Sequence, residues 1–359
     1  MAEKVTIQDI ARLAKVSTGT VSRVLNNKPD VDPSTRERIL HIVEEHRYVP
    51  SITAAGLAVG RNRLISVLVP ALTWPLVTEL IGSVAEFVDN LSHEIVLYSI
   101  STQNHERDCG RIIDRILATK LTAGLLAIFP GQSTQHLLEL HQHGFPVVLI
   151  DDQNPPLEGI PWVGTDNRGG AYEATQYLLK LGHRRIAYIQ GPIKYKVSHE
   201  RYQGYCDALQ EFGIAPDPVL VGEGDFMPPG GRICASAFFE LPETERPTAI
   251  FAGSDLMAYG VMSAAESFGL RIPDDLSLVG FDDNPSSAHM RPALTTVRQP
   301  FADMGRRAIE LLFSVIEQSR VTQQRLSNNE RLPQAITMAE TPRIQLPASL
   351  VIRSTCRAL

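Results

Sequence analysis

The sequence has few cysteines and no long apolar run, and both absences narrow the class of protein. Its 359 residues include only four cysteines, which lie far apart without a CxxC spacing. Neither a disulfide framework nor a thiolate metal site is therefore indicated, and a reducing compartment fits. The stretch MAEKVTIQDIARL lacks the apolar core of a signal peptide, and the run Leu64 to Leu72 is too short to span a bilayer. We expect a cytoplasmic protein with no membrane partner.

The short motifs of several enzyme classes are also missing. There is no GxSxG, no P-loop, no GxGxxG after a strand and no HExxH. The histidines of QHLLELHQHG (His136, His141 and His143) do not have the i, i+4 spacing that presents two metal ligands on one helix face. We therefore expect no enzyme activity, no metal and no cofactor.

Charge is divided unevenly along the chain. Residues 1–63 hold ten Lys/Arg and seven Asp/Glu, a charge of +3, whereas the whole chain has a charge of −6. A small basic head on an acidic body is typical of a protein whose head binds a polyanion, although chance explains so small an excess equally well. At this length, with 43% hydrophobic and 21% charged residues, we expect two or more globular domains.

Three short helices account for the head. Thr6 precedes an apolar-periodic run and Asp9 stands three residues later, which is the pattern of a capping box. Ser17 can cap a second helix, and Asp32 followed by Pro33 opens a third. Two helices joined by a tight turn and closed by a third make a helix-turn-helix. The apolar residues of these helices are Ile7, Ile10, Ala11, Leu13, Ala14, Val21, Val24, Leu25, Ile39, Leu40, Ile42 and Val43.

The second of these helices has the composition of a DNA-reading helix. With its apolar residues turned inward, Thr18, Gly19 and Arg23 point outward near the helix N-terminus, where backbone N–H groups favour phosphate. Arg23 can donate two hydrogen bonds to guanine O6 and N7. A surface helix of an ordinary helical domain is the alternative. The polar residues that suit phosphate oxygens are Ser17, Thr20, Ser22 and Asn26.

From Leu64 onward, strand-length apolar runs alternate with helix-period segments. The runs are LISVLV, EIVLYS, AGLLAIF, PVVLI, RRIAYIQG, TAIFAGS and LSLVGFDD. This alternation predicts an α/β fold with parallel sheets in two successive halves, which meet near residue 161. We expect a helix over Phe301 to Ile316 and a surface loop over the polar stretch Glu317 to Arg343.

The stretch VTIQDIARLAKVSTGTVSRVLN, the YVP segment and Leu57 resemble the lactose-repressor (LacI/GalR) family of bacterial transcription regulators, and the resemblance runs essentially end to end. It implies an N-terminal all-α helix-turn-helix domain over 1–49 and a hinge helix or linker over 50–62. A two-lobed α/β core like the type I periplasmic-binding-protein fold then spans 63–359. The first lobe should comprise about 63–161 and 294–320, and the second about 162–293 and 321–359.

The resemblance also implies DNA contacts from the head and the hinge. Ser51 to Val59 should be a hinge helix that pairs with its dimer mate in the operator minor groove, with Leu57 prying open a central base step such as CG. Ala55 and Gly56 depart from the family pattern, so hinge folding should cost more. The DNA-contacting residues that we expect are Thr6, Ile7, Ser17, Thr18, Gly19, Thr20, Ser22, Arg23, Asn26, Thr35, Tyr48 and Leu57.

Candidate ligand residues come from strand ends and from the same resemblance. Asp282 ends LSLVGF and Asp151 follows PVVLI, so both should lie at the carboxyl edge of a sheet. Asp282 matches the family's ligand-contacting aspartate and Arg201 its cleft arginine. Asp255 and Asp283 are as well suited to capping a helix as to binding a ligand. The other ligand candidates are Phe226 as a stacking aromatic, Trp74 near the cleft mouth and Ser254, and for the two aromatic residues packing is the alternative.

Together these features predict a ligand-responsive transcription repressor that binds a palindromic operator in double-stranded DNA as a homodimer. Two carboxylates and aromatic faces suit a sugar or sugar derivative, and also a nucleoside. A solute-binding sensor is the competing class, for which we would expect a signal peptide and no DNA-binding head. The sequence leaves open whether the ligand weakens or strengthens operator binding.

Overall fold

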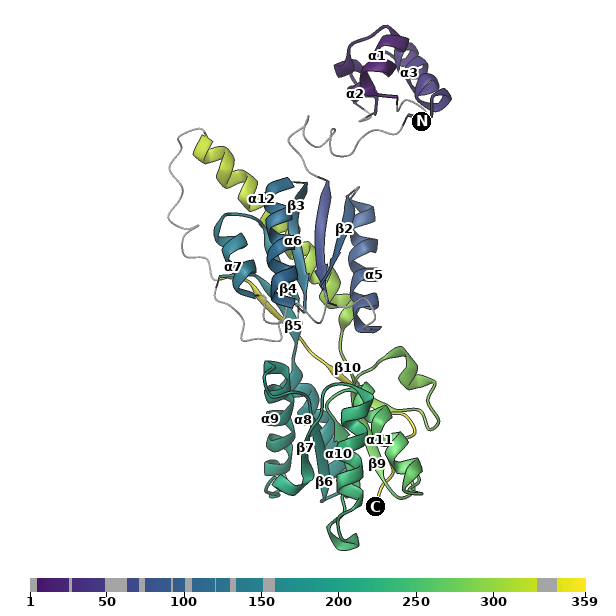
Figure 1. The fold of residues 1–359 in the computed structure, drawn as a ribbon, viewed down its shortest axis with the longest axis vertical. Coiled ribbons are helices and arrows are strands. Elements are labelled where there is room, and N and C mark those ends of the chain that lie inside the picture. The colour runs from purple at the N-terminus through teal and green to yellow at the C-terminus, as the bar shows by residue number, and fades with distance from the viewer. Residues whose placement is uncertain are drawn as a thin grey trace. The chain divides into compact units, whose positions relative to one another are not determined.

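The structure is a computed structural model of the chain. It describes residues 5–25, 28–48, 63–70, 75–91, 93–100, 105–119, 121–129, 134–150, 159–327 and 341–359. The chain divides into a small unit, residues 1–64 with 121–123, and a large unit, residues 65–120 with 124–359 (Figure 1).

The described part of the head forms three helices, α1 (Ile7–Ala14), α2 (Thr18–Leu25) and α3 (Pro33–Glu45). Thr6 Oγ1 accepts a hydrogen bond from the backbone N–H of Asp9, and the Asp9 carboxylate accepts one from the backbone N–H of Thr6. The predicted capping box is therefore confirmed. Asp32 caps α3 by accepting a hydrogen bond from the backbone N–H of Thr35 at 3.1 Å.

One small apolar core joins the three helices. Its buried members are Ile10, Ala11, Ala14, Val21, Val24 and Ile39. Two leucines of the apolar pattern lie outside this core, because Leu13 is 49% and Leu40 46% exposed. Each stands next to a buried residue, and successive positions on a helix point about 100° apart. Leu40 instead lines an open hollow of about 700 Å³ on the head surface, together with Pro29, Val31, Pro33, Arg36, Glu37, His41 and Glu44.

After the head, the described residues form two six-stranded sheets, and we call each sheet with its helices a lobe. In the first lobe the strand order is β11-β5-β4-β3-β1-β2. Its strands are β1 (Leu64–Val69), β2 (Glu94–Ser99), β3 (Thr122–Ile128), β4 (Val147–Ile150), β5 (Trp162–Thr165) and β11 (Arg343–Leu346). Its helices are α5 (Pro75–Asn90), α6 (His105–Thr119), α7 (Thr134–Gln142) and α12 (Phe301–Ser327).

The second lobe has the strand order β12-β10-β9-β8-β6-β7, parallel throughout except where β12 pairs antiparallel to β10. Its strands are β6 (Ile186–Gln190), β7 (Val221–Glu223), β8 (Ala249–Ala252), β9 (Ser277–Asp282), β10 (Thr295–Arg298) and β12 (Ser349–Val351). Its helices are α8 (Asn167–Lys180), α9 (Lys196–Glu211), α10 (Pro228–Phe239) and α11 (Asp255–Ser267).

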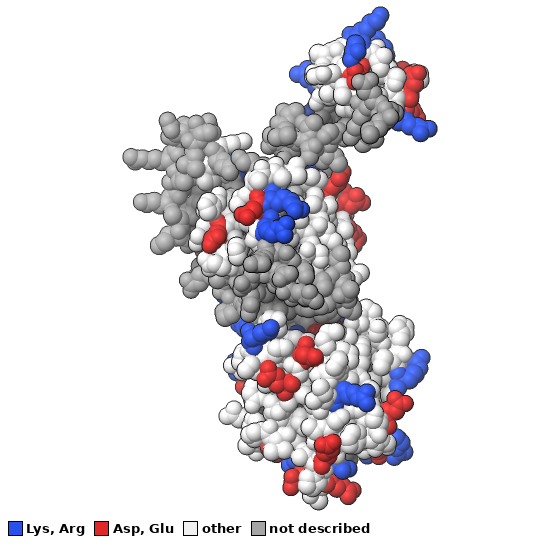
Figure 2. All heavy atoms as spheres, in the orientation of Figure 1, with Lys and Arg blue, Asp and Glu red and all other residues white. Residues whose placement is uncertain are grey.

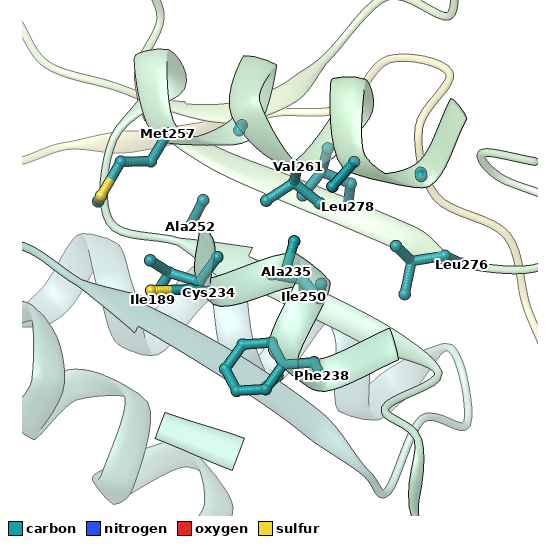
Figure 3. Close-up of a cluster of buried hydrophobic side chains, with 14 of the residues drawn as sticks. Ile189, Cys234, Ala235, Phe238, Ile250, Ala252, Met257, Val261, Leu276 and Leu278 are labelled. Carbon is teal, nitrogen blue, oxygen red and sulfur yellow. The ribbon is translucent and has the colours of Figure 1, made fainter. Parts of the chain in front are cut away.

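Helices cover both faces of the second sheet. On one face, Phe238 of α10 and Val261 of α11 pack with Ile189 and Ile250 of the strands (Figure 3). On the other face, Leu178 of α8 and Leu209 of α9 pack against the opposite side of the same strands. Strands buried on both faces are characteristic of parallel α/β sheets, so the predicted fold class is confirmed.

The lobe bounds expected from the sequence were wrong in three places. Trp162–Thr165 pairs with β4 in the first sheet, not the second. Thr295–Arg298 pairs with β9 in the second sheet, so the chain returns to the first lobe only after it. Beyond it, α12 continues eleven residues past Ile316, through part of the expected loop. Arg343–Leu346 then forms β11 beside β5 in the first sheet. Three connections therefore link the lobes, and β5, β10 and β11 end at them.

Candidate functional site

The outer surface of α2 has the exposed polar residues that the sequence predicts. Thr18, Gly19 and Arg23 are exposed and Ser22 is half-buried. Ser17 caps the helix, because its hydroxyl accepts a hydrogen bond from the backbone N–H of Thr20 at 3.1 Å. A Cβ added at Gly19 would meet only Ser17 Oγ, at 3.6 Å, so the glycine is not required by packing. This surface therefore has room for close approach to a ligand.

Other predicted DNA-contacting residues also cap helices or pack within the head itself. Thr6 is exposed and caps α1, and Thr35 is half-buried in the first turn of α3. Ile7 and Tyr48 are half-buried and pack against the head core. Figure 2 shows both basic and acidic side chains on the visible face of the head. The predicted residues Asn26, Leu57, Trp74 and Asp151 lie outside the described part of the chain.

In the second lobe, the two residues expected to bind ligand most directly lie together. Arg201 of α9 is 4% exposed, and its NH2 atom is 3.6 Å from Oδ1 of Asp282 at the end of β9. The guanidinium also donates from Nε to Asn167 Oδ1 at 2.9 Å and from NH1 to the Gly253 carbonyl at 2.6 Å. Its Cζ lies 3.7 Å from the centroid of the Phe281 ring. Arg201 is therefore fixed by charge, hydrogen bonds and a cation–π contact.

Burial sets the protonation of this pair. Asp282 is 9% exposed, and burial raises the pKa of its carboxyl to about 6, although Arg201 and the side chain of Gln299 oppose the shift. Asp282 also has a φ of 117°, and its neighbour Asp283 a φ of 55°, both in the region that favours glycine. Strained backbone of this kind is concentrated at functional sites.

Phe226 lies beside the same arginine and is strained as well. Its ring centroid is 6.0 Å from Arg201 Cζ, and its φ is 64°. The ring packs so closely on Gly191 that a Cβ there would be 2.0 Å from Phe226 Cζ. Ser254 donates a hydrogen bond from Oγ to the Phe226 carbonyl at 3.3 Å and caps α11 through the Met257 N–H. The Ser254 hydroxyl therefore already has both a donor and an acceptor partner.

The two aspartates that the sequence left between capping and binding have other roles. Asp283 accepts from Nε of Arg298 at 2.6 Å and from NH2 of Arg353 at 2.5 Å, so it links β10 to the segment after β12. Asp255 is fully buried and accepts hydrogen bonds from the Asn284 N–H and from two hydroxyl groups. Burial, and then the charge of Asp282, raise the pKa of Asp255 to about 8.

Sequence reasoning missed two polar residues that complete the site. Gln299, directly after β10, donates from Nε2 to Asp282 Oδ1 at 2.7 Å. Its Oε1 is buried and has no hydrogen-bond partner among the described residues, and the same is true of Ser198 Oγ near Arg201 on α9. The rule that ligands meet the carboxyl ends of parallel strands would have selected Gln299, because β10 ends at Arg298.

A hollow of about 390 Å³ opens at this sheet edge. It is lined by Glu79 of α5, and by residues of the second lobe and its connection to α12, which are Asp282, Asp283, Asn284, Pro285, Ala288, Arg298, Gln299 and Arg353. Burial, and the charge of Asp283, raise the pKa of Glu79. Among the described residues, no group of His, Cys, Asp or Glu is arranged to hold a metal ion. The lining offers acceptors and charged donors, which suit a polar ligand of small size.

A three-helix head with a capped second helix, followed by a two-sheet core with polar groups at the strand ends, is the arrangement of a DNA-binding regulator. Within the described chain, no helix has the length and apolarity needed to cross a membrane. The model of the bacterial regulatory proteins of the lacI family matches residues 6–51, and that of the periplasmic binding protein-like domain matches residues 175–356.

Similar proteins agree with this class. Catabolite control protein A of Priestia megaterium is 35% identical over 321 residues, which cover 88% of this chain and 94% of that protein. The crystal structure of the lac repressor dimer bound to operator and the anti-inducer ONPF superposes with a TM-score of 0.82 at 26% identity and covers 99% of this chain and all of that one. A complex of the transcriptional regulator CelR with cellobiose superposes with a TM-score of 0.68 at 29% identity, covering 98% and 99%. The chain belongs to the lacI family of bacterial transcription regulators, as its head motif indicated.

Proposed function

We propose that this lacI-family protein is a repressor that binds a palindromic operator as a homodimer, with its operator affinity controlled by a sugar or sugar derivative. The observation that carries the ligand part is the buried Arg201–Asp282 pair beside the unpaired Oε1 of Gln299. These groups accept and donate hydrogen bonds at one sheet edge, as the hydroxyl groups of a sugar require. The half-buried Phe226 adds an aromatic surface next to them.

The DNA part of the proposal rests on the head. Arg23 donates to guanine in the major groove, and the small exposed residues Thr18 and Gly19 let α2 approach the base edges. Ser17, Thr20, Ser22 and the first turn of α3 position the head on phosphates. Two heads related by the two-fold axis of a dimer read the two halves of a palindrome.

Linkage between the two sites would make the regulator respond to its ligand. Ligand bound at Asp282 and Arg201 changes the orientation of one lobe relative to the other, because three chain connections link the lobes near this site. Two of these connections carry residues of the site, since Gln299 follows β10 and Asn167 follows β5. A ligand that binds one lobe arrangement better shifts the population of the arrangement that holds DNA. The cellobiose bound to CelR is the precedent for a sugar.

The operator part is tested at Leu57. We propose that the Leu57 side chain inserts into a central base step of the operator. Leu57→Ala should lower affinity for the operator much more than affinity for a duplex of unrelated sequence, because only the operator is kinked. Fluorescence anisotropy with both duplexes measures the two affinities. Equal losses on both duplexes would refute the wedge.

The ligand part is tested by thermal shift of the purified protein against mono- and disaccharides, sugar phosphates, polyols and nucleosides. A ligand at about 100 times its Kd stabilises the native state by roughly 2.7 kcal/mol, a readily measured shift. Asp282→Asn is the matched variant, because it removes one charge and keeps the shape. A sugar that shifts the wild type and this variant equally would place its site elsewhere, and a nucleoside as the sole stabiliser would replace the sugar assignment.

A further inference from the structure

An acidic residue lies beside the arginine of α2. Asp30 Oδ2 is 3.4 Å from Arg23 NH1, and the two side chains are 56% and 64% exposed. An exposed ion pair of this kind adds little to folding stability. An acid on a surface that meets DNA also repels phosphate, which weakens binding to any sequence. Neither stability nor general DNA affinity therefore accounts for Asp30.

The backbone on both sides of Asp30 is anchored to the head. The Lys28 N–H donates to the Arg23 carbonyl at the end of α2, at 2.9 Å. The Lys28 carbonyl in turn accepts a hydrogen bond from the Arg36 side chain of α3. On the other side, Val31 packs against the head core. Asp30 is therefore held near Arg23 by the fold rather than by the ion pair alone.

The ion pair uses only one edge of the Arg23 guanidinium. A guanidinium has five N–H donors in a planar fork, and a carboxylate at NH1 leaves Nε and NH2 free to donate side by side. Two parallel donors are what guanine O6 and N7 accept. We propose that Asp30 is a positioning residue, which orients the Arg23 guanidinium so that Nε and NH2 face guanine. The inference rests on the proposed function, in which Arg23 contacts a base.

This role has two opposite consequences for DNA binding. Removing Asp30 should reduce discrimination at the guanine that Arg23 contacts, by roughly two- to fivefold, the range of an exposed charge pair. The same change should raise affinity for unrelated DNA, because one repulsive charge is lost. Removing Arg23 itself should cost more, roughly 5- to 150-fold in discrimination, as expected for a bidentate base contact.

The test uses the full chain and three duplexes. The first duplex is recovered by selection from a randomised pool. The second carries another base in place of one guanine, which is identified as the position where Arg23→Ala no longer distinguishes the bases. The third has an unrelated sequence. Asp30→Ala is compared with Asp30→Glu, which keeps the charge, and with Glu45→Ala. Glu45 is an exposed acid at the end of α3, so its removal changes the net charge of the head equally. Circular dichroism checks that each variant is folded.

The expected result is a loss of discrimination for Asp30→Ala, with retention for Asp30→Glu and for Glu45→Ala. Discrimination that is unchanged or improved in Asp30→Ala would overturn the inference, and an improvement would show that Asp30 restrains Arg23. If Arg23→Ala keeps full discrimination at every base, the base contact assigned to Arg23 fails, and the inference fails with it. The two failures are distinguished by the Arg23 variant alone.

Discussion

Replacing Arg201 by methionine would remove the charge that faces Asp282 and keep most of the side-chain volume. Asp282 would then keep its hydrogen bond from Gln299, while Asn167 Oδ1 and the Gly253 carbonyl would each lose a donor. All of this takes place in a buried site, since Arg201 is 4% and Asp282 9% exposed. Breaking a buried ion pair from one side costs about 3–5 kcal/mol. We expect Arg201→Met to lower the free energy of unfolding by that amount at neutral pH.

The cost should depend on pH in a defined direction. Burial already raises the pKa of Asp282 to about 6, and the loss of Arg201 raises this pKa further. The native variant then keeps a proton that the unfolded chain has released, so the cost should be largest near pH 8 and shrink toward about pH 5. Urea unfolding followed by circular dichroism measures the free energy of unfolding of the wild type and the variant at pH 8 and at pH 5, and the difference at each pH is the cost.

The matched control is an exposed pair in the same lobe. Arg168 Nε lies 2.6 Å from Asp207 Oδ2, with the side chains 56% and 37% exposed. Arg168→Met should cost under about 1 kcal/mol at either pH, because water screens the pair. If Arg201→Met costs no more than this control, or if its cost fails to shrink at low pH, the buried pair does not have the energetic role assigned to it.

Further predictions concern helix packing and a second buried acid. Gly204→Ala should destabilise the protein by about 3 kcal/mol or more, the upper end of the usual cost of overpacking, because the added Cβ would lie 2.2 Å from the Arg168 carbonyl oxygen. Gly82→Ala, with open space around the new Cβ in α5, should instead stabilise by up to about 1 kcal/mol, and thermal unfolding compares the two. For Asp255, a pKa of about 8 means that the native state keeps its proton while the unfolded chain loses it above about pH 4, so stability should fall as pH rises toward 8. Asp255→Asn should flatten that fall in urea unfolding, and an unchanged pH profile would contradict the assignment.

Local signals made the head predictable from the sequence. Thr6 with Asp9, Ser17, and Asp32 with Pro33 define three helix starts, and each cap acts within a few residues of chain. Leu13 and Leu40 were counted with the apolar residues of the helices but are exposed, because a residue next to a buried one points about 100° away from it around the helix. Exposure of such a residue depends on how wide the packed stripe is, which the sequence alone does not give.

The core was predictable in class and less so in its connections. The runs that formed β1, β3, β4, β6, β8 and β9 are apolar and mostly buried, and β2 is apolar in sequence but only half-buried. In contrast, β5, β11 and β12 are short and only partly apolar. Residues 317–327 lack apolar periodicity, yet they continue α12 because extending an existing helix needs no new nucleus. At the site, Asp282 was predicted from its place at a strand end and from the family resemblance, and Arg201 from the resemblance alone. The strand-end rule selects Gln299 only once β10 is recognised as a strand, and TTVR was not among the predicted apolar runs, so its contact with Asp282 and its unpaired oxygen identified it.

Recognition of a palindromic operator by this chain is tested most directly by selecting duplexes from a randomised pool with the purified full chain and sequencing them. We expect an enriched palindrome with two related half-sites about one helical turn apart, a guanine in each half-site that Arg23→Ala ceases to prefer, and a flexible pyrimidine–purine step at the centre. Enrichment of a single unrepeated site, or no enrichment above unrelated DNA, would contradict a dimeric regulator that reads a palindromic operator.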